Sequence, residues 1–433
     1  MARPAAADTA TTSAEPSAAA DPPGITDTVD SADSPVGDSP AAATHPPHAP
    51  LWLLALATLS GTLAMHMFVP ALPLAAQDLD ASTGAMQMTI SVYIFGLAIG
   101  QPIYGPLADR WGRRPVLMAG LLLYTVAGVV SGLARDIDTM LVARLLQALG
   151  GCAGLVLGRT MVRDTARALE ATRRLALMNL MVTLGPILSP VLGSLISIAW
   201  GWRAIFVALT LAGCLTMLCA WRRLPETRSA EAPASAAELS RHYLALLTSP
   251  VFLGFALGGA CATTSMYAFL SSAPFIFTQE LDRPAHEVGL YLALLTSGVW
   301  LGSMTTSRLV HRVSARRLMF GANGLGLAAA FVLLVASAAG HLSIGVAVAC
   351  LILFSFGAGI ASPVALMQAL SVNPLAIGST SGLYGSLQMG VGALCTALAG
   401  LGHGTALVAA AVMACASLIA QGSFWLASRP SRA

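Results

Sequence analysis

Long apolar stretches alternate with short polar breaks along most of the chain. Each stretch has about the 20 residues that an α-helix needs to cross a bilayer. A soluble domain would interrupt such runs with polar faces, so the pattern predicts an all-α membrane protein. We predict twelve transmembrane helices, at 51–74, 85–107, 115–134, 139–161, 175–199, 202–221, 250–277, 288–309, 318–340, 342–366, 379–401 and 404–426.

Two longer polar segments divide this pattern. Residues 1–50 have almost no large apolar side chain, so we expect a disordered cytoplasmic tail there. Residues 222–249 separate the spans six and six, which predicts an N-terminal half at 51–221, a central cytoplasmic loop and a C-terminal half at 250–427. The composition agrees, because 56% of the 433 residues are hydrophobic and only 10% are charged.

The basic residues, all of them arginine, are distributed unevenly between the two sets of loops. Their positive charge predicts a cytoplasmic location for the loops that follow spans two, four, six and eight, and therefore for both termini. These loops and their flanks hold Arg110, Arg113, Arg114, Arg159, Arg163, Arg167, Arg173, Arg174, Arg222, Arg223, Arg228, Arg241, Arg308, Arg312, Arg316 and Arg317. The opposite loops hold only Arg135, Arg203 and Arg283.

A charged motif joins the second and third spans. It reads GPLADRWGRR over 105–114 and resembles the signature loop of the major facilitator superfamily. A degenerate copy, SRLVHRVSAR, follows the eighth span at 307–316. The resemblance implies two six-helix halves related as parallel repeats, and a loop that acts as a conformational latch. The latch residues would be Gly105, which permits a close helix contact, with Asp109, Arg110, Gly112, Arg113 and Arg114.

The fourth span contains an arginine, Arg144, followed by Gln147 and Gly150. A charged side chain within a span costs about 2.5–3.5 kcal/mol on insertion scales, so it usually faces a cavity or a partner. The run resembles the R-x-x-Q-x-x-G motif of the same family, which implies a role in proton coupling. The alternative is that Arg144 extends to the outer membrane interface.

The fifth span carries Gly185, Pro186, Pro190 and Gly193. Prolines free backbone carbonyl groups and bend a membrane helix. The run resembles the antiporter motif of exporters, with serine in place of two of its glycines, and it favours export over uptake.

His66 lies in the run HMFVPALP at the end of the first span. With the loop motif and the run GWRAIF at 201–206, this run resembles the bicyclomycin-resistance (Bcr/CflA) branch of drug:proton antiporters over about residues 51–427, a branch that usually has aspartate at the position of His66. No predicted span interior contains an acid, and an unperturbed imidazole pKa of about 6.5 suits a proton carrier. The alternative is a neutral histidine hydrogen-bonded between helices.

The remaining polar side chains within the spans are candidates for a substrate cavity. A pocket without acids favours neutral or zwitterionic solutes over strong cations. The candidates are Tyr93, Gln101, Gln147, Asn179, Tyr267, Gln368, Tyr384 and Gln388. No nucleotide-binding loop, metal-ligand cluster or catalytic triad pattern occurs in the sequence, so we predict neither an enzyme nor a cofactor.

Together these observations predict a transporter of the bacterial inner membrane that exports a small organic compound or antibiotic by proton-coupled alternating access. Its partners would be the small-molecule substrate, protons and the lipid bilayer, without nucleic acid, and it would act as a monomer. Two alternatives stay open: an exporter of a metabolite such as an amino-acid derivative or siderophore, and a transporter-like sensor that is not coupled to protons.

Overall fold

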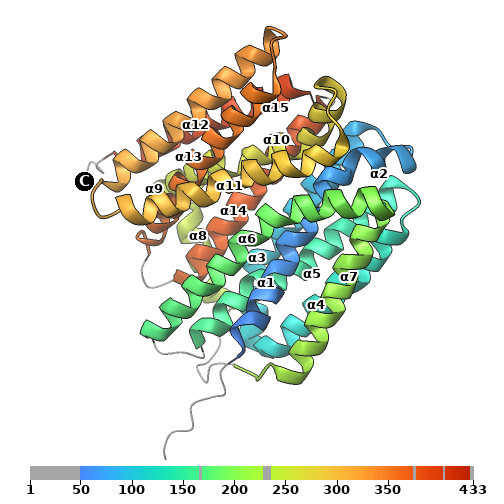
Figure 1. Ribbon diagram of the computed structural model, residues 1–433. Helices are drawn as coiled ribbons and strands as arrows, with labels where there is room; N and C mark the ends of the chain where they lie inside the picture. The colour runs from blue at the N-terminus through green and yellow to red at the C-terminus, as the bar shows by residue number, and fades with distance from the viewer. Residues whose placement is uncertain (1–48, 165–167, 228–235, 374–376, 403–404, 430–433) are drawn as a thin grey trace, which may run out of the picture. The chain divides into compact units, whose positions relative to one another are not determined.

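The computed structural model describes residues 49–429, apart from 165–167, 228–235, 374–376 and 403–404, so the predicted tail lies almost wholly outside the described residues. All regular structure in the described part is helical (Figure 1). The elements are α1 (Leu51–Phe68), η1 (Val69–Ala71), α2 (Leu72–Asp78), α3 (Thr83–Trp111), α4 (Arg113–Leu133), α5 (Ile137–Asp164), α6 (Ala168–Trp200), α7 (Arg203–Arg223), α8 (Ala236–Leu247), α9 (Pro250–Thr264), α10 (Met266–Phe275), η2 (Ile276–Glu280), α11 (Ala285–Leu309), α12 (Ala315–Ala338), α13 (Ile344–Leu370), α14 (Ile377–Leu401) and α15 (Ala406–Ala427).

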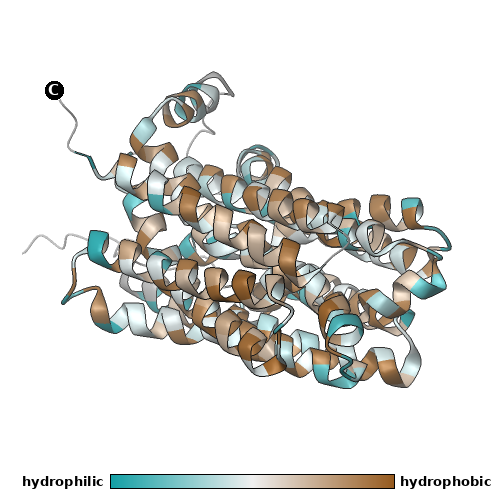
Figure 2. Cartoon of the chain, turned by 90° about the horizontal axis from the view of Figure 1, so that it is seen from above, coloured by the Kyte–Doolittle hydropathy of each residue, from teal (hydrophilic) through white to brown (hydrophobic). Residues whose placement is uncertain are grey.

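Eleven helical segments in the described residues are long and apolar enough to cross a membrane, against twelve predicted. The first runs through α1, η1 and α2, and the seventh through α9, α10 and η2. The predicted span 379–401 coincides with α14, a helix of 25 residues that is too rich in glycine and serine to count among the eleven. Hydrophobic residues predominate along the middle of the helices, and hydrophilic residues gather toward the helix ends (Figure 2).

Two predicted loops are more ordered than expected. The motif at 105–114 is not a loop: α3 continues to Trp111 and α4 begins at Arg113, so Gly112 alone joins the two helices. Gly112 makes this abrupt turn with φ of +94°, a conformation that glycine adopts without a Cβ clash. The central segment 222–249 contains the helix α8.

The helices form two sets of neighbours. In one set, α5 packs against α1, α3 and α4, and α7 packs against α4. In the other, α13 packs against α9, α11 and α12, and α15 against α9 and α12. Two extensive contacts connect the sets, α3 with α14 and α6 with α11 (Figure 1).

Both connecting contacts include a hydroxyl group that bonds a carbonyl freed by proline. Pro102 and Pro190 have no backbone N–H, so the carbonyls of Ala98 and Pro186, four residues earlier, lack their helical donors. Ser386 of α14 donates to the Ala98 carbonyl at 2.8 Å. Thr296 of α11 donates to the Pro186 carbonyl at 3.2 Å. The two proline-containing helices are therefore hydrogen-bonded across the two sets.

We distinguish the two ends of this helix bundle by their charge. The Arg-rich end carries Arg110–Arg114, Arg163, Arg222–Arg223 and Arg308–Arg317. The Arg-poor end carries the short connections 79–82, 134–136, 201–202, 281–284 and 339–343.

Candidate functional site

A cavity of about 650 Å³ lies toward the Arg-rich end of the bundle. It reaches the surface there, where Asp109 and Arg163 are exposed. Helices α3, α4, α5, α6, α8, α13 and α14 contribute to its walls, so both helix sets face it. Its polar and charged lining residues are Gln101, Asp109, Arg113, Arg159, Thr160, Arg163, Asn179, Tyr243, Ser379 and Ser381.

The Arg-poor end, by contrast, is closed by contacts between the two sets. Gln87 donates to the hydroxyl of Ser272 at 3.3 Å, and Ser194 donates to the Ala285 carbonyl at 3.2 Å. Gly289 of α11 lies so close to α6 that a Cβ on it would meet the Pro190 carbonyl oxygen at 2.7 Å. The bundle thus holds a cavity at one end and tight packing at the other.

Two of the eight predicted cavity residues, Gln101 and Asn179, line this cavity. The Tyr93 hydroxyl instead donates to the Gly61 carbonyl at 2.6 Å, and the residue is fully buried. Gln388 donates to the hydroxyl of Thr263 at 2.8 Å. The others lie elsewhere: Gln147 beside Arg144, Tyr267 beside His66, Tyr384 buried against Gly259, and Gln368 half-buried on α13.

Two further side chains with polar groups, Arg159 and Tyr243, line the cavity, although the sequence pattern did not single them out as cavity residues. Arg159 lies near the end of the predicted fourth span, and α5 continues to Asp164 and holds it on the cavity wall. The spacing of Arg159 and Arg163, one helical turn apart, could have shown that both belong to a helical face. Tyr243 belongs to α8, and its hydroxyl donates to the Pro102 carbonyl at 3.3 Å, which Pro106 leaves without a helical donor. Burial raises the pKa of Tyr243, so it remains a neutral donor.

Arg144 is completely buried on α5, so the alternative in which it extends to the membrane interface is wrong. Its Nη1 donates to Oε1 of Gln147 at 2.7 Å. The guanidinium carbon lies 4.1 Å from the ring centre of Tyr93, 5.4 Å from that of Phe68 and 5.7 Å from that of Phe206. Aromatic faces attract a cation, and this attraction strengthens when water is excluded.

Several polar atoms around Arg144 have no hydrogen-bond partner in the described part of the chain. They are Nε and Nη2 of Arg144, Nε2 of Gln147, the hydroxyl of Tyr124 and the hydroxyl of Thr210. An unpaired buried donor costs about 1–3 kcal/mol, more when it is charged. These donor and acceptor groups around Arg144 can therefore form further hydrogen bonds that the observed packing does not provide.

His66 is buried near the end of α1, where it faces the second helix set. Its Nδ1 lies 2.9 Å from the Thr62 carbonyl oxygen, and its ring centre lies 6.4 Å from that of Tyr267 on α10. A carbonyl oxygen only accepts, so Nδ1 carries the hydrogen and the neutral ring keeps Nε2 as an acceptor. His66 is not among the residues that line the cavity.

The charged residues of the predicted latch motif make their contacts within the first helix set. Arg113 lies 3.4 Å from a carboxylate oxygen of Asp109 and forms a second ion pair with Asp164 at the end of α5. Arg114 donates to the Trp221 carbonyl at 2.6 Å, while Arg110 is exposed. Together these residues connect α3, α4, α5 and α7 at the Arg-rich end.

Glu226, just after α7, completes this cluster. Its carboxylate oxygens accept from the backbone N–H groups of Arg113 at 2.9 Å and Arg114 at 3.3 Å. These are the first N–H groups of α4, which lack intrahelical partners, and the helix dipole favours a negative charge there.

The role expected for Gly105 is wrong in one respect. A Cβ on Gly105 would meet nothing within 4 Å, because this glycine faces the cavity rather than a neighbouring helix.

The predicted antiporter motif packs α6 against α1. Gly193 lies against the Met67 carbonyl, and Gly185 against the side chain of Leu59. Pro186 and Pro190 lie on the same helix, beside the contact with α11. The motif thus lies where α6 contacts helices of both sets.

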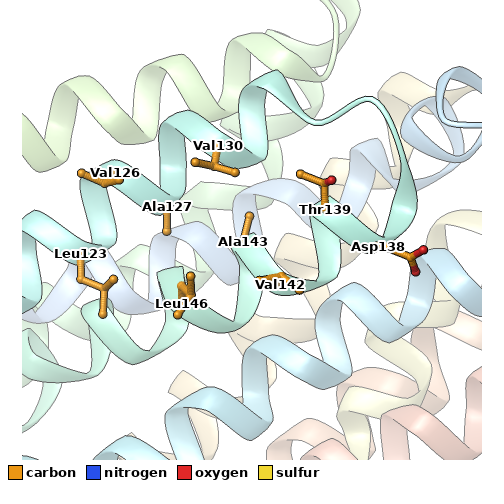
Figure 3. A pocket seen from close by; sticks show the side chains of 9 residues that line it. All are labelled: Leu123, Val126, Ala127, Val130, Asp138, Thr139, Val142, Ala143 and Leu146. Carbon is orange, nitrogen blue, oxygen red and sulfur yellow. The ribbon is translucent and has the colours of Figure 1, made fainter.

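A second hollow, of about 430 Å³, lies between α4 and α5 (Figure 3). Its walls are almost wholly apolar, and exposed side chains such as Val126, Val130 and Val142 contribute to it. Asp138 and Thr139 lie at its Arg-poor end. This surface suits lipid chains and lacks the polar groups of the larger cavity.

Sequence comparisons agree with the membrane architecture. A family model described as the Major Facilitator Superfamily matches residues 54–396. Multidrug resistance protein MdtL from Escherichia coli (strain K12 / DH10B) is 31% identical over 326 residues, which cover 75% of this chain and 81% of the relative. Multidrug resistance protein D from E. coli (strain K12) is 27% identical over 78% of this chain and 85% of the relative. The bicyclomycin resistance protein homolog of Haemophilus influenzae is 24% identical over 79% of this chain and 87% of the relative.

Solved structures support the same fold. The partially occluded, inward-open xylose transporter XylE from E. coli has a TM-score of 0.67 at 13% identity, covering 88% of this chain and 98% of that one. An inward-facing bacterial homologue of the human lysosomal transporter Spinster has a TM-score of 0.64 at 17% identity, with the same coverage of both chains. The chain belongs to the Major Facilitator Superfamily, on the branch of its multidrug- and bicyclomycin-resistance relatives, and it is a multi-pass membrane transporter rather than an enzyme.

Proposed function

We propose that this transporter exports small organic compounds, including antibiotics, from the bacterial cytoplasm in exchange for protons. The observation that carries the proposal is the 650 Å³ cavity, which both helix sets line and which closes toward the Arg-poor end. The names of the multidrug- and bicyclomycin-resistance relatives support a drug as the cargo.

The orientation follows from charge. The Arg-rich end faces the cytoplasm under the positive-inside rule, so the cavity opens to the cytoplasm of the inner membrane and both termini are cytoplasmic. The two helix sets are the six-helix halves. We count α14 as a transmembrane helix as well, which brings the eleven spans to twelve, because it packs along α3. Rocking of one half against the other then exposes the cavity to each side in turn. The carrier acts as a monomer, and its partners are the solute, protons and lipid.

His66 and Arg144 couple this movement to protons. Nε2 of His66 is the proton acceptor, because the Thr62 carbonyl holds the hydrogen of Nδ1. His66 faces Tyr267 of the opposite half, so the charge of the imidazolium acts where the halves meet. Arg144 tunes the coupling from a buried site, where its guanidinium lies among three aromatic rings and keeps unpaired donors beside Gln147.

Drug-induced proton movement in inside-out vesicles tests the proposal. A pH-sensitive dye reports the gradient while a panel that includes bicyclomycin and chloramphenicol is added to wild type and to His66→Ala. We expect at least one compound to dissipate the gradient with wild type and not with His66→Ala at equal membrane levels. Dissipation by both proteins would remove His66 from the proton path, and a response by neither would contradict proton-coupled drug export.

A further inference from the structure

The cavity holds more positive charge than its own acids neutralise. Arg113, Arg159 and Arg163 line it, and Asp109 is the one acid among the described lining residues. Asp109 is already paired with Arg113, which also pairs with Asp164. The nearby carboxylates are therefore committed to Arg113, and the other two cations remain.

Arg159 lies one helical turn farther from the Arg-rich end than Arg163 on α5. Both arginines are exposed in the open cavity, and next to Arg159 the wall is apolar, with Leu155 and Val156. In the described part of the chain, the Arg159 guanidinium has no hydrogen bond, ion pair or aromatic contact. Hydrogen bonds between a guanidinium and an anion are about twice as strong as neutral ones, so an anion that enters the cavity is the partner it binds best.

The surrounding residues add a neutral donor and an apolar surface. Asn179 of α6 lines the same cavity, and its side-chain amide has no partner among the described residues, whereas the Thr160 hydroxyl already donates to the Val156 carbonyl at 3.0 Å. On the opposite wall, α13 contributes Leu366 and Leu370. The cavity thus combines a free planar cation, a neutral amide and an apolar face.

From this arrangement we infer that the cavity binds solutes with a carboxylate group, either organic anions or zwitterions, and that Arg159 binds the carboxylate. Two parallel N–H donors of arginine match the two oxygens of a carboxylate, which a lysine or a neutral amide cannot reproduce. The apolar body of the solute packs against the α13 wall. The inference rests on the proposed function, because it names the substrate class of the same cavity.

Two matched fluorescent probes test it: dansylglycine, which has a carboxylate, and dansylglycinamide, which is uncharged. Binding is measured by fluorescence titration of the purified full-length protein in detergent. We expect wild type to bind dansylglycine at least tenfold more tightly, and benzoate but not benzamide to displace it. Arg159→Gln should lose this preference but keep its affinity for dansylglycinamide. Arg312→Gln removes one exposed arginine from the same end and should behave as wild type. Equal affinities of wild type for the two probes would overturn the inference.

A lipid phosphate is the other source of an anion, and repeating the titration in nanodiscs separates it from the solute. With phosphatidylcholine alone, or with added phosphatidylglycerol, the dansylglycine affinity should stay the same. A tenfold weakening by phosphatidylglycerol would assign Arg159 to a lipid headgroup and overturn the inference. The titration needs no proton gradient, so failure of proton-driven export would contradict the proposed function and leave this binding result standing.

Discussion

The two ends of the bundle differ in what connects the two helix sets. At the Arg-rich end, ion pairs and the Glu226 carboxylate connect helices within the first set and leave a cavity between the sets. At the Arg-poor end, neutral hydrogen bonds and glycine contacts connect one set to the other. Charged contacts thus lie within a helix set, while neutral contacts join the two sets.

This difference suits the alternating access that we propose, in which the two helix sets must separate. A neutral hydrogen bond contributes about 0.5–1.5 kcal/mol net, and in membrane proteins it averages about 0.6 kcal/mol. Contacts of that size at the Arg-poor end can break at modest cost during each cycle. The ion pairs around Arg113 do not have to break for that end to open, because they lie within one helix set.

The largest effect should come from preventing closure of the Arg-poor end. Gly289→Leu places a side chain where a Cβ alone would lie 2.7 Å from both the Pro190 carbonyl oxygen and Cβ of Ser194. We expect α11 to be held away from α6, so that export falls at least tenfold at normal membrane levels. Drug-driven proton movement in inside-out vesicles measures the loss.

The matched control is Gly345→Leu. Gly345 lies on α13 near the same Arg-poor end of the bundle, and a Cβ on it would meet nothing within 4 Å. It should retain wild-type transport. The opening itself can be followed by labelling Ser272→Cys with a membrane-impermeant maleimide, which should become faster in Gly289→Leu. Unchanged labelling together with full transport would mean that closure here is not required.

The second effect concerns Arg144, which is completely buried in the first helix set. Arg144→Gln removes the cation from the three aromatic rings, an interaction of about 2 kcal/mol or more in a water-free site. Export should fall about 30-fold, which is that energy at about 1.4 kcal/mol per factor of ten. Arg144→Lys keeps the charge and should recover part of the rate. Equal rates for Arg144→Gln and wild type would make the residue structural.

At the Arg-rich end, Glu226→Ala should affect stability more than transport. The change leaves two N–H groups at the start of α4 without the carboxylate, and loss of such a cap costs about 1 kcal/mol. We expect a lower midpoint of thermal unfolding in detergent. Glu226→Gln keeps one carbonyl oxygen as an acceptor and should lie between wild type and Glu226→Ala. A midpoint equal to wild type in Glu226→Ala would show that water replaces the carboxylate at no cost.

The sequence predicted the fold better than it predicted the cavity, for a physical reason. Apolar length decides whether a helix crosses the membrane, so every predicted span lies on a helical segment. α14 is less apolar than the other spans because it lies between other helices, where glycine and serine allow close packing. The direction in which a side chain points depends on helix rotation, which apolar length does not encode. Gln101 consequently lines the cavity, whereas Tyr93 on the same helix bonds to α1.

The smallest effects should come from the hydroxyl groups that bond the proline-freed carbonyls. The Ser386 hydroxyl has one acceptor, the Ala98 carbonyl at 2.8 Å, so Ser386→Ala leaves that carbonyl unpaired and should cost about 0.6 kcal/mol. Thr296 divides its hydrogen between the Pro186 carbonyl at 3.2 Å and two carbonyls of its own helix at 3.0 and 3.1 Å. Thr296→Val should therefore cost less than Ser386→Ala, as measured by thermal unfolding of both variants in one detergent. A larger cost for Thr296→Val would show that the α6–α11 contact, and not the α3–α14 contact, is the stronger connection between the halves.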